Sequence, residues 1–136
     1  MLNFMEKDIV LLGVIFDPKT RKILIGRREQ DKHIPQLTWA FLGGRPKGDK
    51  ELDEELERRI KEKTGLDIKN LGNIFARILP EKEDMLVIYF LCEVIGGEEN
   101  LGDDTVELKW VSPDEIESHF TTSFHPKLKE YIMNLK

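Results

Sequence analysis

Hydrophobic positions follow two different periods along this 136-residue chain, and each period predicts a kind of secondary structure. Residues 9–16 (IVLLGVIF) are almost continuously apolar, which is typical of a strand with both faces covered. The polar turn 17–22 (DPKTRK) separates them from a second apolar run, so we predict a hairpin here. In all, six segments have the composition of strands: 9–16, 22–28, 39–42, 68–79, 85–95 and 108–111.

A helical period appears between residues 50 and 64. The apolar stripe of this segment consists of Leu52, Leu56 and Ile60. Residues four apart lie on one face of a helix, so the segment is predicted to be amphipathic. Asp49 is the expected N-cap, and Gly65 the left-handed residue that ends the helix.

The C-terminal third predicts two more helices. Residues 112–116 (SPDEI) have the pattern of a helix start, with Ser112 as N-cap and Pro113 in the first position. Residues 125–135 have an amphipathic pattern. Strands flanked by helices favour an α/β fold in which a mixed β-sheet lies between helical layers, and the length favours a single domain over residues 1–136.

Composition narrows the classes of protein. The net charge of −5, with 35% charged residues, argues against a dedicated nucleic-acid binder. The lone cysteine, Cys92, lies in an apolar run, so we expect a buried strand residue and a reducing compartment. The N-terminal apolar run is too short to span a bilayer and has no basic leader. We therefore expect a cytoplasmic protein without a membrane partner.

The segment 39–66 (WAFLGGRPKGDKELDEELERRIKEKTGL) combines a strand, a glycine turn and a helix. It resembles the signature of the Nudix family, GX5EX7REUXEEXGU, in which U is an aliphatic residue. The matching positions are Gly44, Arg58, Ile60, Glu62, Gly65 and Leu66. The late segment VELKWVSPDEI also resembles the strand, turn and helix near the end of many members.

This resemblance implies a Nudix-type α/β/α sandwich and a nucleotide or nucleoside diphosphate derivative as partner. Nudix enzymes, MutT-like proteins among them, hydrolyse nucleoside diphosphates linked to another group. Mg²⁺ or Mn²⁺ held by helix carboxylates neutralises the diphosphate and activates water. In this chain the family pattern would place the metal at the Gly44 carbonyl and Glu62. Many members are dimers, so a homodimer stays an open expectation.

Three of the four signature glutamates are replaced by cations, namely Lys50, Arg59 and Lys63. Each replacement reverses a charge, and unit charges about 4 Å apart interact by several kcal/mol at intermediate dielectric. We therefore expect hydrolysis to be weak or lost, with the degenerate box leaving a non-catalytic nucleotide-binding or protein-interaction module as the alternative.

Two further interpretations of the charged residues remain open. A relocated metal site could use the carboxylates of Glu51, Glu55, Asp103, Asp104 and Glu107, with Glu55 beside Glu62 as metal ligands and Glu62 and Glu107 as the catalytic acids. Alternatively, protein cations could bind phosphate directly in place of metal, because arginine grips phosphate with paired hydrogen bonds. The candidate substrate-binding residues are Arg27, Arg45, Arg59 and Lys63. The same charges could also form solvated ion pairs along the helix.

Overall fold

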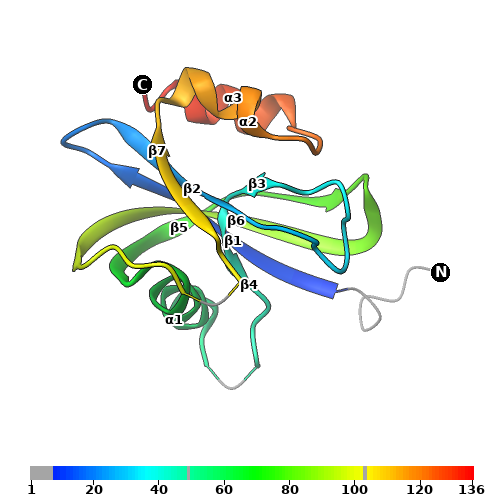
Figure 1. The fold of residues 1–136 in the computed structure, drawn as a ribbon, viewed down its shortest axis with the longest axis horizontal. Helices are drawn as coiled ribbons and strands as arrows, with labels where there is room; N and C mark the ends of the chain where they lie inside the picture. Colours follow the sequence, from blue (N-terminus) through cyan, green and yellow to red (C-terminus); the bar gives the residue numbers. More distant parts are fainter. Residues whose placement is uncertain (1–7, 49, 103) are drawn as a thin grey trace.

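The computed structural model describes residues 8–48, 50–102 and 104–136. A seven-stranded mixed sheet lies between helix α1 on one face and helices α2 and α3 on the other (Figure 1). The strands are β1 (Asp8–Asp17), β2 (Lys22–Arg27), β3 (Trp39–Ala40), β4 (Leu42–Gly44), β5 (Leu66–Leu79), β6 (Lys82–Gly97) and β7 (Glu107–Val111). The predicted α/β/α sandwich is confirmed.

The sheet is mixed because its two central strands run parallel while the others pair antiparallel. Strand β1 pairs with β6 in parallel and with β2 in the predicted hairpin. Strands β5 and β6 form a second, longer hairpin. Its turn is confined to Pro80 and Glu81, because the rest of the predicted PEKED turn continues as strand.

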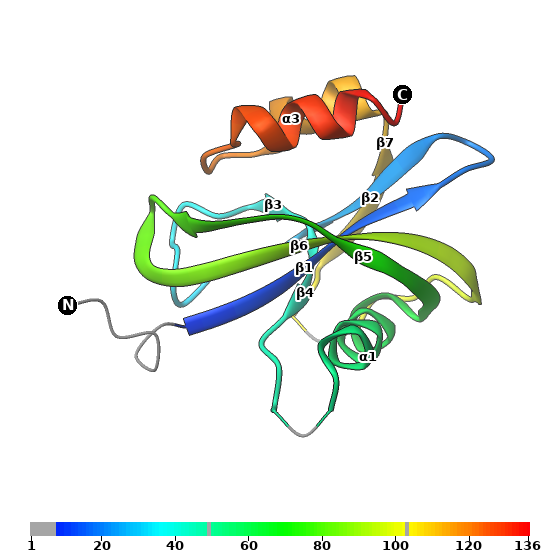
Figure 2. The ribbon, with the colours of Figure 1, turned by 180° about the vertical axis from the view of Figure 1, so that it is seen from behind.

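Two hydrophobic cores occupy the two faces of the sheet. Figure 2 shows these faces from behind, one covered by α1 and the other by α3. Leu11 and Ile15 of β1 belong to the core beneath α1, whereas Val14 belongs to the core beneath α2 and α3. The continuous apolar run of β1 is therefore explained, since both faces of the strand are covered. Cys92 is fully buried in β6, and burial raises the pKa of its thiol to about 12.

Helix α1 spans Leu52–Thr64, two residues shorter than predicted. Leu56 and Ile60 are fully buried, but Leu52 is 43% exposed, so the three-residue stripe was wrong at its first position. Leu52 belongs to the first turn, ahead of the part that packs on the sheet. Gly65 ends the helix with a φ of 77°, as predicted. The expected N-cap, Asp49, lies outside the described residues.

The C-terminal helices are shorter than the sequence predicted. The segment after Ser112 forms a 3₁₀ turn, Pro113–Glu115, and then α2, Ile116–His119. Ser112 makes no side-chain capping bond. Helix α3 spans Pro126–Met133. None of the described helices has the length and hydrophobicity that a membrane crossing requires.

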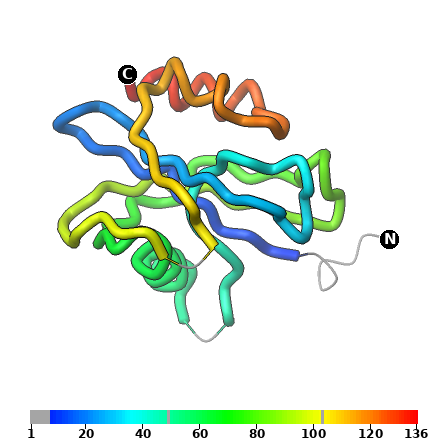
Figure 3. The backbone as a smooth tube through the Cα atoms, in the orientation of Figure 1, coloured from blue at the N-terminus to red at the C-terminus, as the bar shows by residue number. Residues whose placement is uncertain are grey.

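The segment between β6 and β7 passes the C-terminal end of α1 (Figure 3). Asn100 donates its N–H to the carbonyl of Thr64 over 2.7 Å, and Gly102 donates to the carbonyl of Lys63 over 3.1 Å. Backbone bonds of this kind fix a connecting segment as firmly as a side-chain contact. They bring the residues before β7 beside the charged flank of α1.

Candidate functional site

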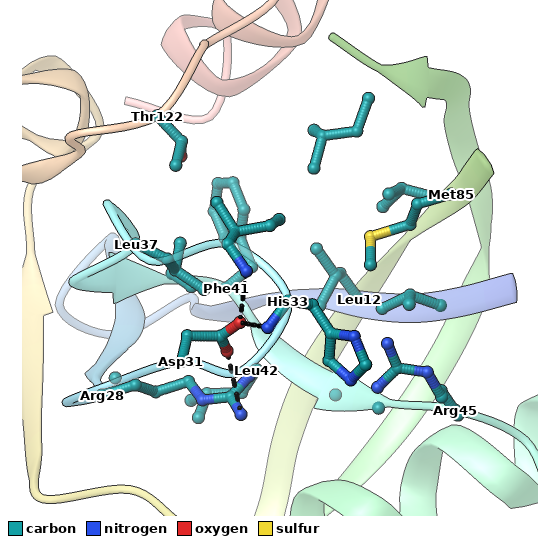
Figure 4. A pocket seen from close by; sticks show the side chains of 18 of the residues that line it. Leu12, Arg28, Asp31, His33, Leu37, Phe41, Leu42, Arg45, Met85 and Thr122 are labelled. Atoms are coloured by element: carbon teal, nitrogen blue, oxygen red, sulfur yellow. Dashed lines mark hydrogen bonds and ion pairs between the residues drawn. The ribbon is translucent and has the colours of Figure 1, made fainter. Parts of the chain in front are cut away.

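A cavity of about 160 Å³ opens between the glycine strand β4, the end of α1 and the loop that follows β2 (Figure 4). Its lining changes character from one end to the other. Near α1 the lining is basic, with Arg28, Arg45, Arg59 and Lys63. Farther from α1 the lining is apolar and aromatic, with Leu12, Phe41, Met85 and Tyr89 among the residues. Three of the four predicted substrate-binding cations therefore line one cavity.

The guanidinium of Arg59 lies directly against Gly44. A Cβ added to Gly44 would come within 2.5 Å of Nε and 2.8 Å of Nη2 of Arg59. Only glycine allows a side chain to approach the backbone this closely. In the family pattern the Gly44 carbonyl would face a metal, and here a cationic side chain stands beside that residue.

Lys63 is a buried cation at the same end of the cavity. Its side chain is 6% exposed, and Nζ lies 3.4 Å from Oδ1 of Asp104. Burial lowers the pKa of Lys63, and the charge of Asp104 only partly opposes that effect. Buried lysines are rare without a partner or a function, because the ammonium loses its hydration.

Arg28 and Arg45 are held by carboxylates at the rim of the cavity. Nη2 of Arg28 lies 3.1 Å from Oδ2 of Asp31 and also contacts Asp104. Arg45 donates to both oxygens of Asp8 over 2.8 Å and 2.6 Å. Hydrogen bonding from Arg45 is the main cause that lowers the pKa of Asp8.

Asp31 shapes the loop that forms one wall of the cavity. Its Oδ1 accepts the backbone N–H groups of His33 and Ile34 over 2.9 Å and 2.8 Å (Figure 4). Burial acts to raise the pKa of Asp31, but these backbone bonds outweigh it and the pKa is lowered. Asp31 was not among the site residues predicted from the sequence. The signal that could have found it is the aspartate that begins a polar turn before Pro35, a common position for a side chain that bonds to the following backbone.

The two helix carboxylates proposed as metal ligands are both engaged with protein groups. Glu62 accepts from Nη1 of Arg58 over 2.7 Å and from Nη1 of Arg59 over 3.1 Å. Burial acts to raise the pKa of Glu62, but these two arginines outweigh it and lower the pKa. Glu55 is fully buried, accepts from the backbone N–H of Lys47, and lies 3.5 Å from Nη2 of Arg58.

Four of the predicted site residues lie outside the cavity lining, namely Glu55, Glu62, Arg27 and Glu107. Arg27 and Glu107 pair with each other over 3.0 Å, and Arg27 also contacts Glu29 over 2.9 Å. Arg28 directly follows Arg27, the last residue of β2, and adjacent residues of an extended chain point to opposite sides. Arg28 consequently lines the cavity while Arg27 does not. Asp104 lines the cavity as well, whereas Asp103 lies outside the described residues.

The described side chains do not fit a divalent metal in the family's arrangement. Such a metal requires several oxygen ligands around one point. Over residues 8–48, 50–102 and 104–136, no group of three or more His, Cys, Asp and Glu side chains is placed to hold a metal ion. The metal-ligand roles of Gly44, Glu55 and Glu62, and the catalytic roles of Glu62 and Glu107, stay predictions.

Comparison with known proteins agrees with this fold. The chain is 29% identical to an ADP-ribose pyrophosphatase of Methanocaldococcus jannaschii over an alignment of 112 residues. This alignment covers 79% of this chain and 63% of that relative. Two solved structures share the fold. A MutT protein from Methanosarcina mazei superposes with a TM-score of 0.67 at 22% identity, covering 95% of this chain and 92% of that one. A NUDIX hydrolase from Nitrosomonas europaea superposes with a TM-score of 0.75 at 14% identity, covering 98% of this chain and 74% of that one.

The NUDIX domain family model matches residues 7–134, almost the whole chain. The predicted resemblance is therefore confirmed, and this chain belongs to the Nudix family.

Proposed function

We propose that this chain binds the diphosphate of a nucleoside diphosphate derivative through side-chain cations, without a divalent metal, and that hydrolysis is weak or lost. The observation that carries the proposal is the guanidinium of Arg59 against Gly44, at the position where the family pattern implies a metal. Lys63 lines the same end of the cavity. Both are signature glutamate positions, so side chains supply positive charge where the family uses carboxylates and a dication.

The charges of the lining residues support an anionic ligand at the basic end of the cavity. Arg28 and Lys63 share the carboxylate of Asp104, whose side chain is 43% exposed. Arg28 also pairs with the buried carboxylate of Asp31. A diphosphate within reach of Arg28 and Lys63 would offer more negative charge than the partly exposed Asp104 that they share. Arginine can also bind phosphate through two parallel hydrogen bonds, which adds geometric selectivity to the charge attraction.

The weak-hydrolysis part of the proposal rests on the carboxylates. A general base must accept a proton from water, and it does so poorly when cations stabilise its ionised form. Glu62 accepts from two arginines that lower its pKa, and Glu55 is buried against the backbone of Lys47. These contacts leave both carboxylates poorly suited to activate water.

Binding in the presence of chelator tests the proposal. ADP-ribose is the first nucleoside diphosphate derivative to try, because the curated relative is an ADP-ribose pyrophosphatase. Isothermal titration calorimetry in EDTA should detect binding of ADP-ribose and of inorganic diphosphate. Arg59→Met and Lys63→Met should each weaken binding about 10- to 100-fold, the range expected for one charge-assisted hydrogen bond of roughly 1.5–3 kcal/mol.

Arg27→Met is the matched control, because Arg27 is a cation of the neighbouring strand that does not line the cavity. This variant should bind within about twofold of the wild type. Phosphate release should also stay near the level without protein when Mg²⁺ or Mn²⁺ is added. Rapid metal-dependent hydrolysis, or binding that chelator abolishes, would contradict the proposal.

A further inference from the structure

The apolar end of the cavity is framed by aromatic rings. Phe41 meets Tyr89 edge-to-face, with ring centroids 6.0 Å apart, and meets Phe120 in the same way at 5.1 Å. All three residues line the cavity, and Leu12 and Met85 form a further part of its wall (Figure 4). Aromatic rings arranged in this way favour another planar ring, which can extend their offset or edge-to-face contacts.

The size of the space limits what can enter it. The cavity measures about 160 Å³. An engineered apolar cavity of about 150 Å³ holds one benzene molecule. This volume covers both ends of the cavity, and the basic end must also hold the diphosphate. The aromatic end therefore has room for one six-membered ring at most, and not for the fused rings of a purine.

Arg77 places a donor at the aromatic end. Its Nη2 donates to the carbonyl and hydroxyl oxygens of Ser123 over 2.9 Å and 3.1 Å. Its Nε is buried and has no hydrogen-bond acceptor among the described residues. Burial raises the pKa of Tyr89, and both the charge of Arg77 and a side-chain hydrogen bond with Arg77 oppose that effect, so the guanidinium lies close to the aromatic wall. Ser123 is in turn held by Glu81, which accepts from both the hydroxyl and the backbone N–H of Ser123.

We propose that this end of the cavity is a subsite for one six-membered heterocycle with a carbonyl acceptor, the chemistry of uracil, and that Arg77 determines this specificity. The inference rests on the proposed function, because the basic end must hold the diphosphate of the same ligand. It goes further by naming the base and the residue that selects it.

The acceptor requirement follows from the chemistry of the guanidinium. Arginine only donates hydrogen bonds, so an occupant beside it must offer an acceptor. An alkyl group would fill the space but would leave the buried donor unpaired, which is unfavourable. A carbonyl-bearing ring satisfies both the donor of Arg77 and the aromatic wall.

Calorimetry in EDTA tests this subsite with four probes, namely inorganic diphosphate, UDP, ADP and 3-methylbutyl diphosphate. We expect UDP to bind the wild type at least tenfold more tightly than inorganic diphosphate, with ADP and the alkyl diphosphate gaining less than threefold. In Arg77→Met the ratio of the inorganic diphosphate and UDP dissociation constants should fall about tenfold. Arg77→Lys keeps the charge but loses Nε, and should lower the ratio to a similar extent.

Glu81→Ala is the matched control for loosening of the loop. It removes the support of Ser123 but keeps Arg77, and Glu81 does not line the cavity. Its ratio should stay within about twofold of the wild type. An equal fall in Glu81→Ala, or ADP or the alkyl diphosphate binding as tightly as UDP, would overturn the subsite. Failure of inorganic diphosphate to bind the wild type would contradict the proposed function instead, and failure of every probe to bind would overturn both.

Discussion

The two flanks of helix α1 obey different constraints. One flank carries Leu56 and Ile60, both fully buried against the sheet, and Ile60 occupies the aliphatic position of the Nudix signature. The other flank carries Arg59, which lines the cavity in place of a signature glutamate, and the retained Glu62, which pairs with it. Packing decides the first flank, and under the proposed function ligand chemistry decides the second. A family fold can therefore persist while the charge of its site is reversed.

Lys63 and Glu55 lie at the boundary between these flanks. Both are charged and both are buried, a combination that lowers stability unless partners compensate for lost hydration. Asp104 compensates Lys63, and the backbone N–H of Lys47 together with Arg58 compensates Glu55. These two buried charges are therefore the places where we expect a binding function to lower the free energy of unfolding.

The largest expected effect comes from the packed flank. Leu56→Ala should lower the free energy of unfolding by about 2–5 kcal/mol, because it removes a fully buried side chain and leaves a cavity. Leu52→Ala is the control, since Leu52 has the same spacing but is 43% exposed, and it should change stability by about 0.5 kcal/mol or less. Urea denaturation measures both. Similar losses in the two variants would mean that the flanks do not differ as described.

Restoring glutamates at the three replaced signature positions is expected to replace diphosphate binding by metal binding. The triple variant Lys50→Glu, Arg59→Glu, Lys63→Glu should lose chelator-resistant diphosphate binding and gain Mn²⁺ binding. At a hundredfold excess over its dissociation constant, Mn²⁺ should then raise the free energy of unfolding by about 2.7 kcal/mol. Chemical denaturation with and without Mn²⁺ measures this gain.

A second triple variant controls for the change in net charge. Lys61, Lys69 and Lys109 are exposed lysines outside the cavity lining, so their replacement by glutamate reverses the same number of charges elsewhere. Mn²⁺ should not stabilise that variant. Equal stabilisation of both triples, or of the wild type, would show that metal binding does not depend on the signature positions.

Sequence alone predicted the parts of this molecule that depend on local pattern. The hairpin after β1, the end of α1 at Gly65 and the mixed sheet all follow from hydrophobic period and turn residues. Leu52 was misplaced because periodicity gives the face of a helix but not how far the neighbouring sheet extends. The spacing of apolar residues is the same whether the first turn of the helix packs on the sheet or is exposed to solvent.

The candidate site was only partly predictable, for a related reason. Arg59 and Lys63 could be chosen because they occupy signature positions. Arg27 was predicted as a substrate-binding residue and Arg28 was not, although of the two only Arg28 lines the cavity. Which of two adjacent strand residues faces a site depends on the pairing of the whole sheet. Asp104 reaches Arg28 through a loop fixed by long-range backbone bonds, and no local pattern encodes that contact.

A smaller effect is expected at the boundary residue Lys63. Lys63→Met should raise the free energy of unfolding by about 1 kcal/mol while weakening diphosphate binding, a trade-off common at functional sites. The folded-state pKa of Lys63 lies below its ordinary value of 10.5. Between these two pKa values the folded protein binds fewer protons than the unfolded chain, so the wild type gains stability as pH rises toward 10.5. The advantage of the methionine variant should therefore shrink over that range. Urea titrations at pH 7 and at higher pH measure it, and a destabilised variant at pH 7 would contradict it.

The smallest expected effect on stability is at the rim of the cavity, where Asp8 pairs with Arg45. Arg45 lowers the pKa of Asp8 below its ordinary value of 3.8, so the pair contributes stability above that pH and loses it as pH falls through the folded-state pKa. Partly exposed pairs of this kind contribute about 0.2–1 kcal/mol. The difference in unfolding free energy between wild type and Asp8→Asn should therefore be largest near neutral pH and vanish in acid. A difference that grows on acidification would show that Arg45 does not stabilise the ionised carboxylate. Since the substitution removes the carboxylate that pairs with Arg45, the same variant should bind inorganic diphosphate at least as tightly as the wild type.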